Sequence, residues 1–347
     1  MSWKIFVLTF LEVNFVAETI VDTLSFSAPI SSLKYMDNYF FGEICPWSEF
    51  PKMPESGDLH LHQLQKTAAL EQRLVGLVNK FLGLHLSPAT GRGYQGYLEH
   101  HVILDSSGEQ NCGVLAHGGN ENTFYLYLNG HGCKLFFENR TAGDLHKFLT
   151  EVLQVYRLNR LDIACDDYSG STDAQSVIDA YDAGAFYAGR GVAPQIQIIT
   201  TRRERKSLGE TVYVGSRTSQ VYWRTYDKNA EQKISDPATP WIRHEAELKR
   251  VSSDLLLDVD AAFAGCNKFA AALVATEPVV VRTPVEKASV SLESKISWAR
   301  RAVGKTLRDL IDFFDAPTAL ALLTAGEGGK LHLTPGEISV YRDALQI

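Results

Sequence analysis

The sequence has no long uncharged apolar run, no pairing pattern of cysteines and no excess of positive charge. None of its 347 residues lies in a stretch of about twenty uncharged apolar residues, the length that a membrane-spanning helix needs. The five cysteines are scattered and form no CxxC pair, which argues against a disulfide framework or a zinc knuckle and is typical of a reducing cytoplasm. A formal net charge of −7 argues against an indiscriminate polyanion binder, so any nucleic-acid binding has to come from local basic patches. We expect a cytoplasmic globular protein without a membrane partner.

The spacing of apolar residues divides the chain into an α+β part and a helical part. Apolar residues at helical spacing predict helices over 61–82, 141–156 and 172–183. Strands are expected at 21–27, 97–106, 111–118, 122–129, 157–165, 195–201, 211–216, 221–227 and 241–249. The predicted fold class is α+β, with a central, mostly antiparallel sheet flanked by helices and a helical C-terminal region.

One strand carries a tyrosine between two cations. Arg224, Tyr226 and Lys228 are two residues apart, so their side chains lie on one face of the strand. Two cations beside a phenol favour the phenolate and hold phosphate oxygens, as a tyrosine that attacks a phosphodiester requires. The alternative is a half-exposed strand on which the tyrosine only packs.

Two further strands each have one apolar and one ionic face. The ionic faces hold, in chain order, Arg160, Asp162, Asp166, Arg243, Glu245, Glu247 and Lys249. If these strands are neighbours of the tyrosine strand, their carboxylates converge beside it, and clustered carboxylates need a cation. Oxygen ligands of this kind favour Mg²⁺ or Mn²⁺, which would polarise a scissile phosphate. The alternative is a solvated sheet face with surface ion pairs.

The segments RLDIACDD, GSRTSQVYWRTYDKNAEQ and WIRHEAELKR, in this order, resemble the motifs of the Rep_trans group of rolling-circle replication initiators. That group includes initiators of staphylococcal plasmids, replication proteins of filamentous phages and relaxases of integrative elements. The resemblance covers roughly residues 100–250, with VDTLSFS as a first core strand. It implies a metal-dependent nickase and strand transferase that cuts one strand at an origin. Tyr226 would form a 5′-phosphotyrosine link and free a 3′-hydroxyl primer, with Arg224 and Lys228 holding the scissile phosphate.

The same resemblance implies the metal ligands. They map onto Asp162, Asp166 and Glu245, with Glu247 and His131 in reserve. Plasmid initiators carry a glutamate-containing strand ahead of the RLD segment. The corresponding YLYLNGHGCKL has no carboxylate, so the phage branch of the family fits better.

Other histidines and basic residues give weaker signals. The triplet His60-Leu61-His62 matches the metal-binding signature of another class of nickases, but it opens a helical stretch. His100 and His101 are adjacent on a strand and face opposite ways. The candidates for DNA contact are Arg202, Arg203, Arg217 and Arg243.

The order of the predicted elements divides the chain into domains, and the resemblance implies partners. The expected parts are 1–95, an N-terminal strand, irregular segment and helix that join the core; 96–251, the nickase sheet core; and 252–347, a helical region that contacts the origin. Expected partners are origin DNA, as duplex and as extruded single strand, a host helicase with the replication machinery, and a second copy in a homodimer. Two alternatives stay open: a conjugative relaxase, and a DNA-binding replication regulator without catalysis.

Overall fold

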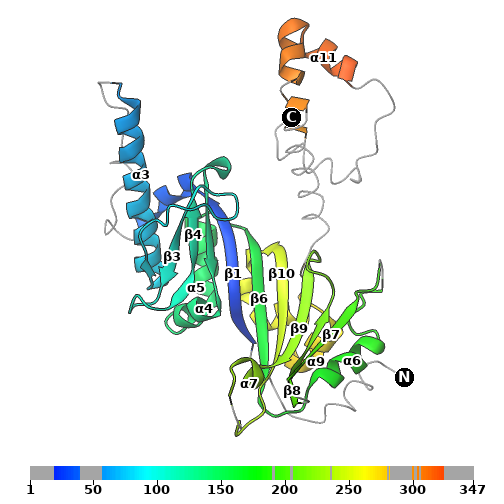
Figure 1. Ribbon diagram of the computed structural model, residues 1–347. Coiled ribbons are helices and arrows are strands. Elements are labelled where there is room, and N and C mark those ends of the chain that lie inside the picture. Colours follow the sequence, from blue (N-terminus) through cyan, green and yellow to red (C-terminus); the bar gives the residue numbers. More distant parts are fainter. Residues whose placement is uncertain are drawn as a thin grey trace. The chain divides into compact units, whose positions relative to one another are not determined.

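The computed structural model describes residues 19–39, 57–189, 192–203, 206–234, 237–279, 281, 299–300, 303–304 and 306–323 (Figure 1). The chain divides into two compact units, Met1–Val281 and Arg282–Ile347. The first unit reaches beyond the boundary expected at residue 252, because Leu255, Leu256 and Phe263 are part of the same hydrophobic core as the sheet.

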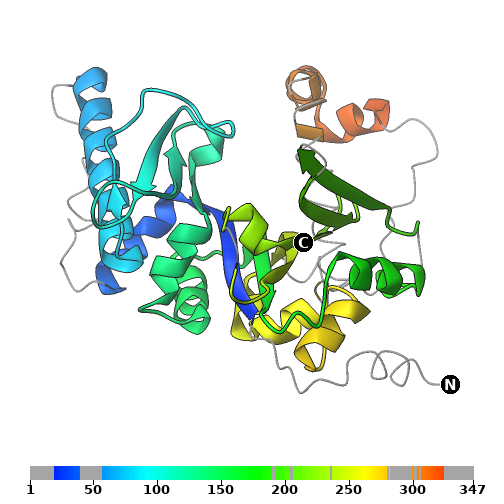
Figure 2. The same ribbon diagram turned by 60° about the horizontal axis from the view of Figure 1, so that its bottom comes forward.

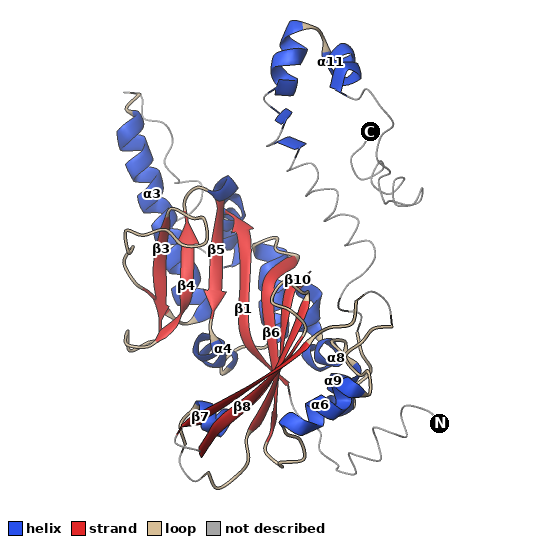
Figure 3. Ribbon diagram, turned by 45° about the vertical axis from the view of Figure 1, so that its right-hand side comes forward, coloured by secondary structure: helices blue, strands red, loops and turns tan. Residues whose placement is uncertain are grey.

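A single ten-stranded sheet runs through the first unit in the order β2-β3-β4-β5-β1-β6-β10-β9-β8-β7 (Figure 1). Its strands are β1 Thr19–Pro29, β2 His85–Leu86, β3 Glu99–Leu104, β4 Asn111–His117, β5 Thr123–Leu128, β6 Arg157–Asp167, β7 Ile196–Arg203, β8 Lys206–Val214, β9 Val221–Asp227 and β10 Ile242–Ser252. Every neighbouring pair is antiparallel. Figure 3 shows the twist that turns β7 and β8 away from the direction of β3 and β4. The α+β fold class with an antiparallel sheet is confirmed.

Most helices pack on one face of this sheet. The helices are α2 Met36–Tyr39, α3 Leu59–Gly76, α4 Gly130–Phe137, α5 Ala142–Lys147, α6 Ala174–Asp182, α7 Lys228–Glu231, α8 Val259–Ala264 and α9 Lys268–Val274, with short 3₁₀ or π turns at Ile30–Tyr35, Leu77–Leu82, Asn120–Asn122, Phe148–Val152 and Ser253–Leu257. Helix α7 lies at the end of β9, beside Tyr226. The predicted helix that begins near Thr141 is confirmed, and Thr141 forms a capping box with Asp144. Figure 2 shows α3 in blue at one end of the sheet and α6 in green at the other.

Strand β1 comes first in the chain but lies in the middle of the sheet, between β5 and β6. Val21 pairs with Ile163 and Thr23 pairs with Asp162, so Asp22 is an extra residue that forms a β-bulge. A bulge re-aims a side chain, and here it is that of the one charged residue of β1.

The described part of the second unit is helical. It includes α11, Ala316–Leu323, and helical residues at 306–313. Residues 324–347 lie outside the described residues, so contact of this region with an origin stays a prediction. Within the described ranges, no helix combines the length and the apolar character that crossing a membrane would require.

Candidate functional site

The three ionic strands are direct neighbours, with β10 between β6 and β9 (Figure 1). Arg243 on β10 lies opposite Asp166 on β6 and opposite Tyr226 on β9. Glu245 likewise lies opposite Arg224. Residues directly opposite each other in an antiparallel pair share a face, so the three ionic faces form one surface.

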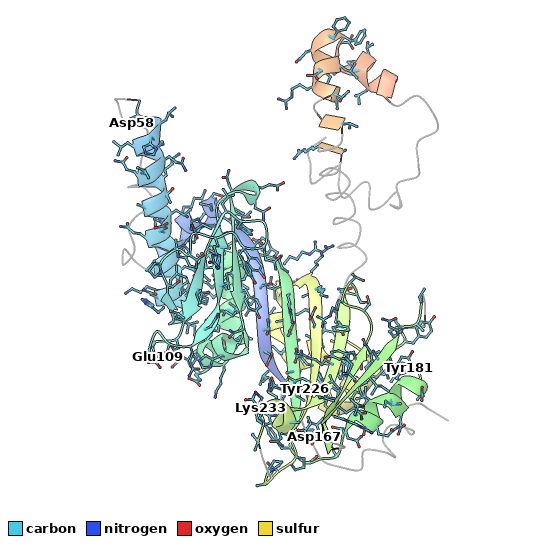
Figure 4. All side chains as sticks on the ribbon, viewed as in Figure 1. Asp58, Glu109, Asp167, Tyr181, Tyr226 and Lys233 are labelled. Carbon is cyan, nitrogen blue, oxygen red and sulfur yellow. The ribbon has the colours of Figure 1, made fainter. Side chains whose placement is uncertain are left out.

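Tyr226 lies near the end of β9, close to the end of β6 at Asp167 (Figure 4). Its hydroxyl is 3.4 Å from Glu245 Oε2, and Lys228 Nζ is 3.4 Å from the same hydroxyl. The Arg224 guanidinium lies 5.1 Å from the centre of the tyrosine ring and pairs with the other oxygen of Glu245. The predicted flanking by two cations is therefore present, although Lys228 already belongs to α7.

The electrostatics of the phenol differ from the expectation. The pKa of Tyr226 is raised above its usual value, first by burial and then by the negative charge of Glu245, and Arg224 and Arg243 lower it by less. Without a metal ion, the desolvation of the half-buried phenol and the carboxylate at its hydroxyl outweigh the two arginines. A group that accepts the proton is needed, and Glu245 is the carboxylate that contacts the hydroxyl.

Asp162 is the most deeply buried of the predicted ligands, with 1% of its surface exposed. Arg160 holds it with two hydrogen bonds, of 2.8 and 2.5 Å. Burial nevertheless raises the pKa of Asp162 to about 7, and Glu245 and Glu247 add to the rise. The carboxylates of β6 and β10 therefore share one region of negative potential.

Asp22 is a functional candidate that the sequence analysis missed. Burial and then Glu245 raise its pKa, so it belongs to the same negative region as Asp162. Arg243 Nη1 donates a 2.6 Å hydrogen bond to its Oδ1. The sequence signal was a lone acid in VDTLSFS. The Asp22 side chain points toward the site because of the bulge, and the residue pattern does not show a bulge.

The other predicted ligands have partners of different kinds. Asp166 accepts two hydrogen bonds, of 2.7 and 2.6 Å, from Arg243. Glu247 pairs with Arg160 at 3.0 Å and with Lys249 at 2.7 Å. His131 lies in the first turn of α4, and its Nε2 is buried without a hydrogen-bond partner among the described residues.

His131 follows Gly130, which lies against the bulge. A Cβ added at Gly130 would be 3.4 Å from Asp22 Oδ1, so the first turn of α4 approaches that carboxylate. Ala164 on β6 lies opposite Glu245 and shares a face with Asp162 and Asp166.

The chemistry of these donors fits a hard divalent cation. Asp22, Asp162 and Glu245 offer oxygen atoms, and Glu245 Oε2 has the tyrosine hydroxyl at 3.4 Å as its partner. Arginines neutralise these carboxylates in this arrangement, so a metal would have to replace part of the arginine contacts. In the parts of the chain that the structure describes, three metal-ligand atoms lie within 4.8 Å of one another only in Glu71, His101 and His117, on other elements.

The predicted DNA-contacting arginines lie in different surroundings. Arg217, in the turn after β8, has its guanidinium 5.6 Å from the ring centre of Tyr222, which stacks on Tyr213 at 5.6 Å. Arg202 is exposed on β7, and the Arg203 side chain lies outside the described residues. Arg243 is 6% exposed and its contacts are with carboxylates, so it holds the acidic residues in place.

The strands that carry the site lie in a region that is similar to a known protein family. Residues 156–319 match the family model described as replication initiation factor, Rep_trans, and this range contains β6, β9 and β10. No curated protein matches the chain. The structure is similar to that of a rolling circle replication initiator protein from Geobacillus stearothermophilus, with 17% sequence identity, a TM-score of 0.46, and coverage of 72% of this chain and 83% of that one. The region that carries Tyr226 and its neighbouring acids on β6 and β10 is therefore similar to the replication initiation factor family.

Proposed function

We propose that the protein initiates rolling-circle replication as a metal-dependent, site-specific DNA nickase and strand transferase. The observation that carries the proposal is the Tyr226 hydroxyl, which lies between Glu245 and Lys228 on a sheet face rich in carboxylates. In the proposed step, Tyr226 Oη attacks the scissile phosphorus and the bond from phosphorus to the 3′-oxygen breaks. The 5′-phosphate stays on the tyrosine, and the 3′-oxygen takes up a proton to become the primer hydroxyl.

Glu245 is the proposed acceptor of the phenol proton. Its Oε2 contacts the hydroxyl, and its other oxygen is paired with Arg224, which fixes the carboxylate in place. Lys228 would then stabilise the phenolate and, after attack, an oxygen of the bound phosphate. Reversal of the same proton transfer allows the later rejoining of the strand.

The proposed metal ligands are Asp162, Glu245 and Asp22, with His131 at the edge. Asp166 and Glu247, which the sequence also suggested, would instead keep their basic partners and balance the charge. A bound Mg²⁺ or Mn²⁺ would withdraw electron density from the scissile phosphate. Arg160 and Arg243 would hold Asp162 and Asp22 in place until the cation takes over part of these contacts.

The proposed path for origin DNA runs from the tyrosine toward the turn after β8. Tyr213 and Tyr222 offer stacked rings on which bases of an extruded single strand can pack, and Arg217 adds a positive charge beside them. A host helicase and a homodimer are further proposals that follow from the replication role.

The test is a nicking assay on a supercoiled plasmid that carries the element's origin, with Mg²⁺. The wild type should give nicked DNA with protein covalently attached, and mass spectrometry should find the adduct on Tyr226. Tyr226→Phe should form no adduct, while Tyr156→Phe, an exposed tyrosine in the same family region, should act as the wild type does. Nicking by Tyr226→Phe at the wild-type rate would refute the proposed nucleophile.

The two alternatives give different results in this assay. A relaxase would form the same phosphotyrosine at a transfer origin rather than at a replication origin. A regulator without catalysis would bind the origin and leave it intact with either metal.

A further inference from the structure

A second group of metal-ligand atoms lies at the other end of the sheet. Glu71 on α3, His101 on β3 and His117 at the end of β4 each offer one ligand atom, and the three atoms lie within 4.8 Å of one another. Four strands, β5, β1, β6 and β10, separate β4 from the tyrosine strand. The group is therefore distinct from the candidate nicking site.

The strand register places the two histidines on the helix-covered face. His101 lies opposite Leu115, and Leu115 lies opposite Leu126, both buried core residues. Glu99 lies opposite His117, so the two histidines are diagonal neighbours on one face. Tyr226 lies on the other face of the sheet. On β10, Leu248 faces the core, and Arg243 is an odd number of residues from it, so Arg243 points away from the core. Tyr226 lies directly opposite Arg243 and therefore shares its face.

The separation of the two imidazoles fits a shared metal ion. The Nε2 atoms of His101 and His117 are 3.2 Å apart, and the two residues are 3% and 5% exposed. Two nitrogens at about 2.0–2.1 Å from a tetrahedral Zn²⁺ are separated by about 3.3 Å. The observed distance is close to that value before any side chain moves.

The tautomer of His101 also fits. Its Nδ1 is 2.9 Å from the carbonyl oxygen of Ser87, and a carbonyl only accepts, so Nδ1 carries the hydrogen. The Nε2 atom of the neutral ring then presents its lone pair toward His117. A backbone carbonyl that fixes the outer nitrogen is the usual support of a metal-bound histidine.

We infer that Glu71, His101 and His117 form a zinc site that fastens helix α3 to the β3–β4 hairpin. Two imidazoles and a carboxylate suit Zn²⁺ better than Mg²⁺, which prefers oxygen ligands alone. Glu71 is half-buried, so its carboxylate can rotate to close the site, with water as a fourth ligand. The role is structural, because the site lies far along the sheet from the tyrosine, and the inference does not depend on the proposed nicking activity.

The test measures zinc binding by the full chain after dialysis against a chelator. The wild type should take up a single Zn²⁺ in competition with a chromogenic chelator, and excess Mg²⁺ should not displace it. Co²⁺ in its place should give the visible absorption of a tetrahedral site. His117→Gln should weaken zinc binding more than about 100-fold, because it removes a direct ligand. Glu71→Gln, at a half-buried helix position that tolerates the change, should weaken it about 10-fold or more.

Two controls separate this site from others. His85→Gln, an exposed histidine on the neighbouring strand β2, should bind zinc as the wild type does. Glu245→Gln should also keep its zinc, which separates the site from the nicking centre. Removal of zinc should increase hydrogen exchange in α3 and leave exchange in β9 unchanged.

Three outcomes would overturn the inference. One is a wild type that takes up no zinc, which is expected if the 3.2 Å contact is a hydrogen bond between neutral imidazoles. Another is unchanged zinc affinity in both His117→Gln and Glu71→Gln. The third is loss of zinc in Glu245→Gln, which would place the ion at the tyrosine.

Discussion

Asp162 is a buried carboxylate that holds its proton more tightly in the folded protein than in the unfolded chain. Its pKa rises from 3.8 to about 7, mainly through burial. A pKa that is raised on folding gives stability that is fully present below pH 3.8 and is lost as the pH rises to about 7. With about 1.4 kcal/mol for each pH unit, full ionisation removes about 4 kcal/mol from the free energy of unfolding of the metal-free protein.

Asp162→Asn removes this dependence, because the amide resembles the protonated acid. We compare the free energy of unfolding, measured in urea with a chelator present. The difference between Asp162→Asn and the wild type should shift by about 3 kcal/mol in favour of the variant as the pH rises from about 5 to about 8.5. Glu109→Gln, which removes an exposed carboxylate, should follow the wild type at every pH. Stability curves of wild type and Asp162→Asn that stay parallel across this range would refute the reasoning.

Magnesium gives an independent check on the same residue. If Mg²⁺ binds at this carboxylate, it should restore stability to the wild type at about pH 8.5, since the cation compensates the buried charge. Asp162→Asn should gain little from the same addition. An equal gain in both proteins would place the stabilising magnesium elsewhere.

Three further predictions concern neighbouring residues. Arg243→Met should lower the free energy of unfolding by about 3 kcal/mol, because it leaves the half-buried carboxylates of Asp22 and Asp166 without their buried arginine. Lys249→Met at the rim should cost less than about 1 kcal/mol in the same urea titration. Glu245→Gln should lower the nicking rate by about 10²–10⁴-fold in single-turnover assays, with DNA affinity kept, and an unchanged rate would exclude it as the proton acceptor. Burial lowers the pKa of His244 from 6.5 to about 4, so stability that is present above pH 6.5 should fall by about 3 kcal/mol as the pH drops toward 4. His244→Gln should lack this loss on acid titration.

The sequence was sufficient for the strands and for the faces of the site. Alternation along 160–167, 221–227 and 241–249 put the ionic side chains on one face of each strand, and the structure pairs those strands as neighbours. The order of the motifs indicated the family whose model matches residues 156–319. These features are local or depend only on the two-residue period of a strand, so they can be predicted from the residue pattern.

Features that depend on how distant segments pack together could not be predicted from the sequence. Asp22 points into the site because of a bulge and because its strand lies beside β6, and neither follows from spacing. The pKa of Tyr226 depends on how deeply it is buried, and the cations beside it suggested the opposite direction. His101 and His117 lie on different strands, and their pairing with a glutamate of α3 required the hairpin register and the helix position.

The position of β1 in the middle of the sheet has a consequence for how the protein is made. Asp22 and Arg243, which bond at 2.6 Å, are 221 residues apart in the chain. A ribosome therefore exposes the first strand long before its partner β6 and the arginine of β10 have been synthesised. Contacts of such sequence separation form slowly, since the chain between them must first be ordered. The acidic residues of β6 and β10 come together only after β10 is complete. Nascent chains or truncations that end before Ile242 would therefore hold the tyrosine without its carboxylate partner, and the proposed nicking would require the completed sheet.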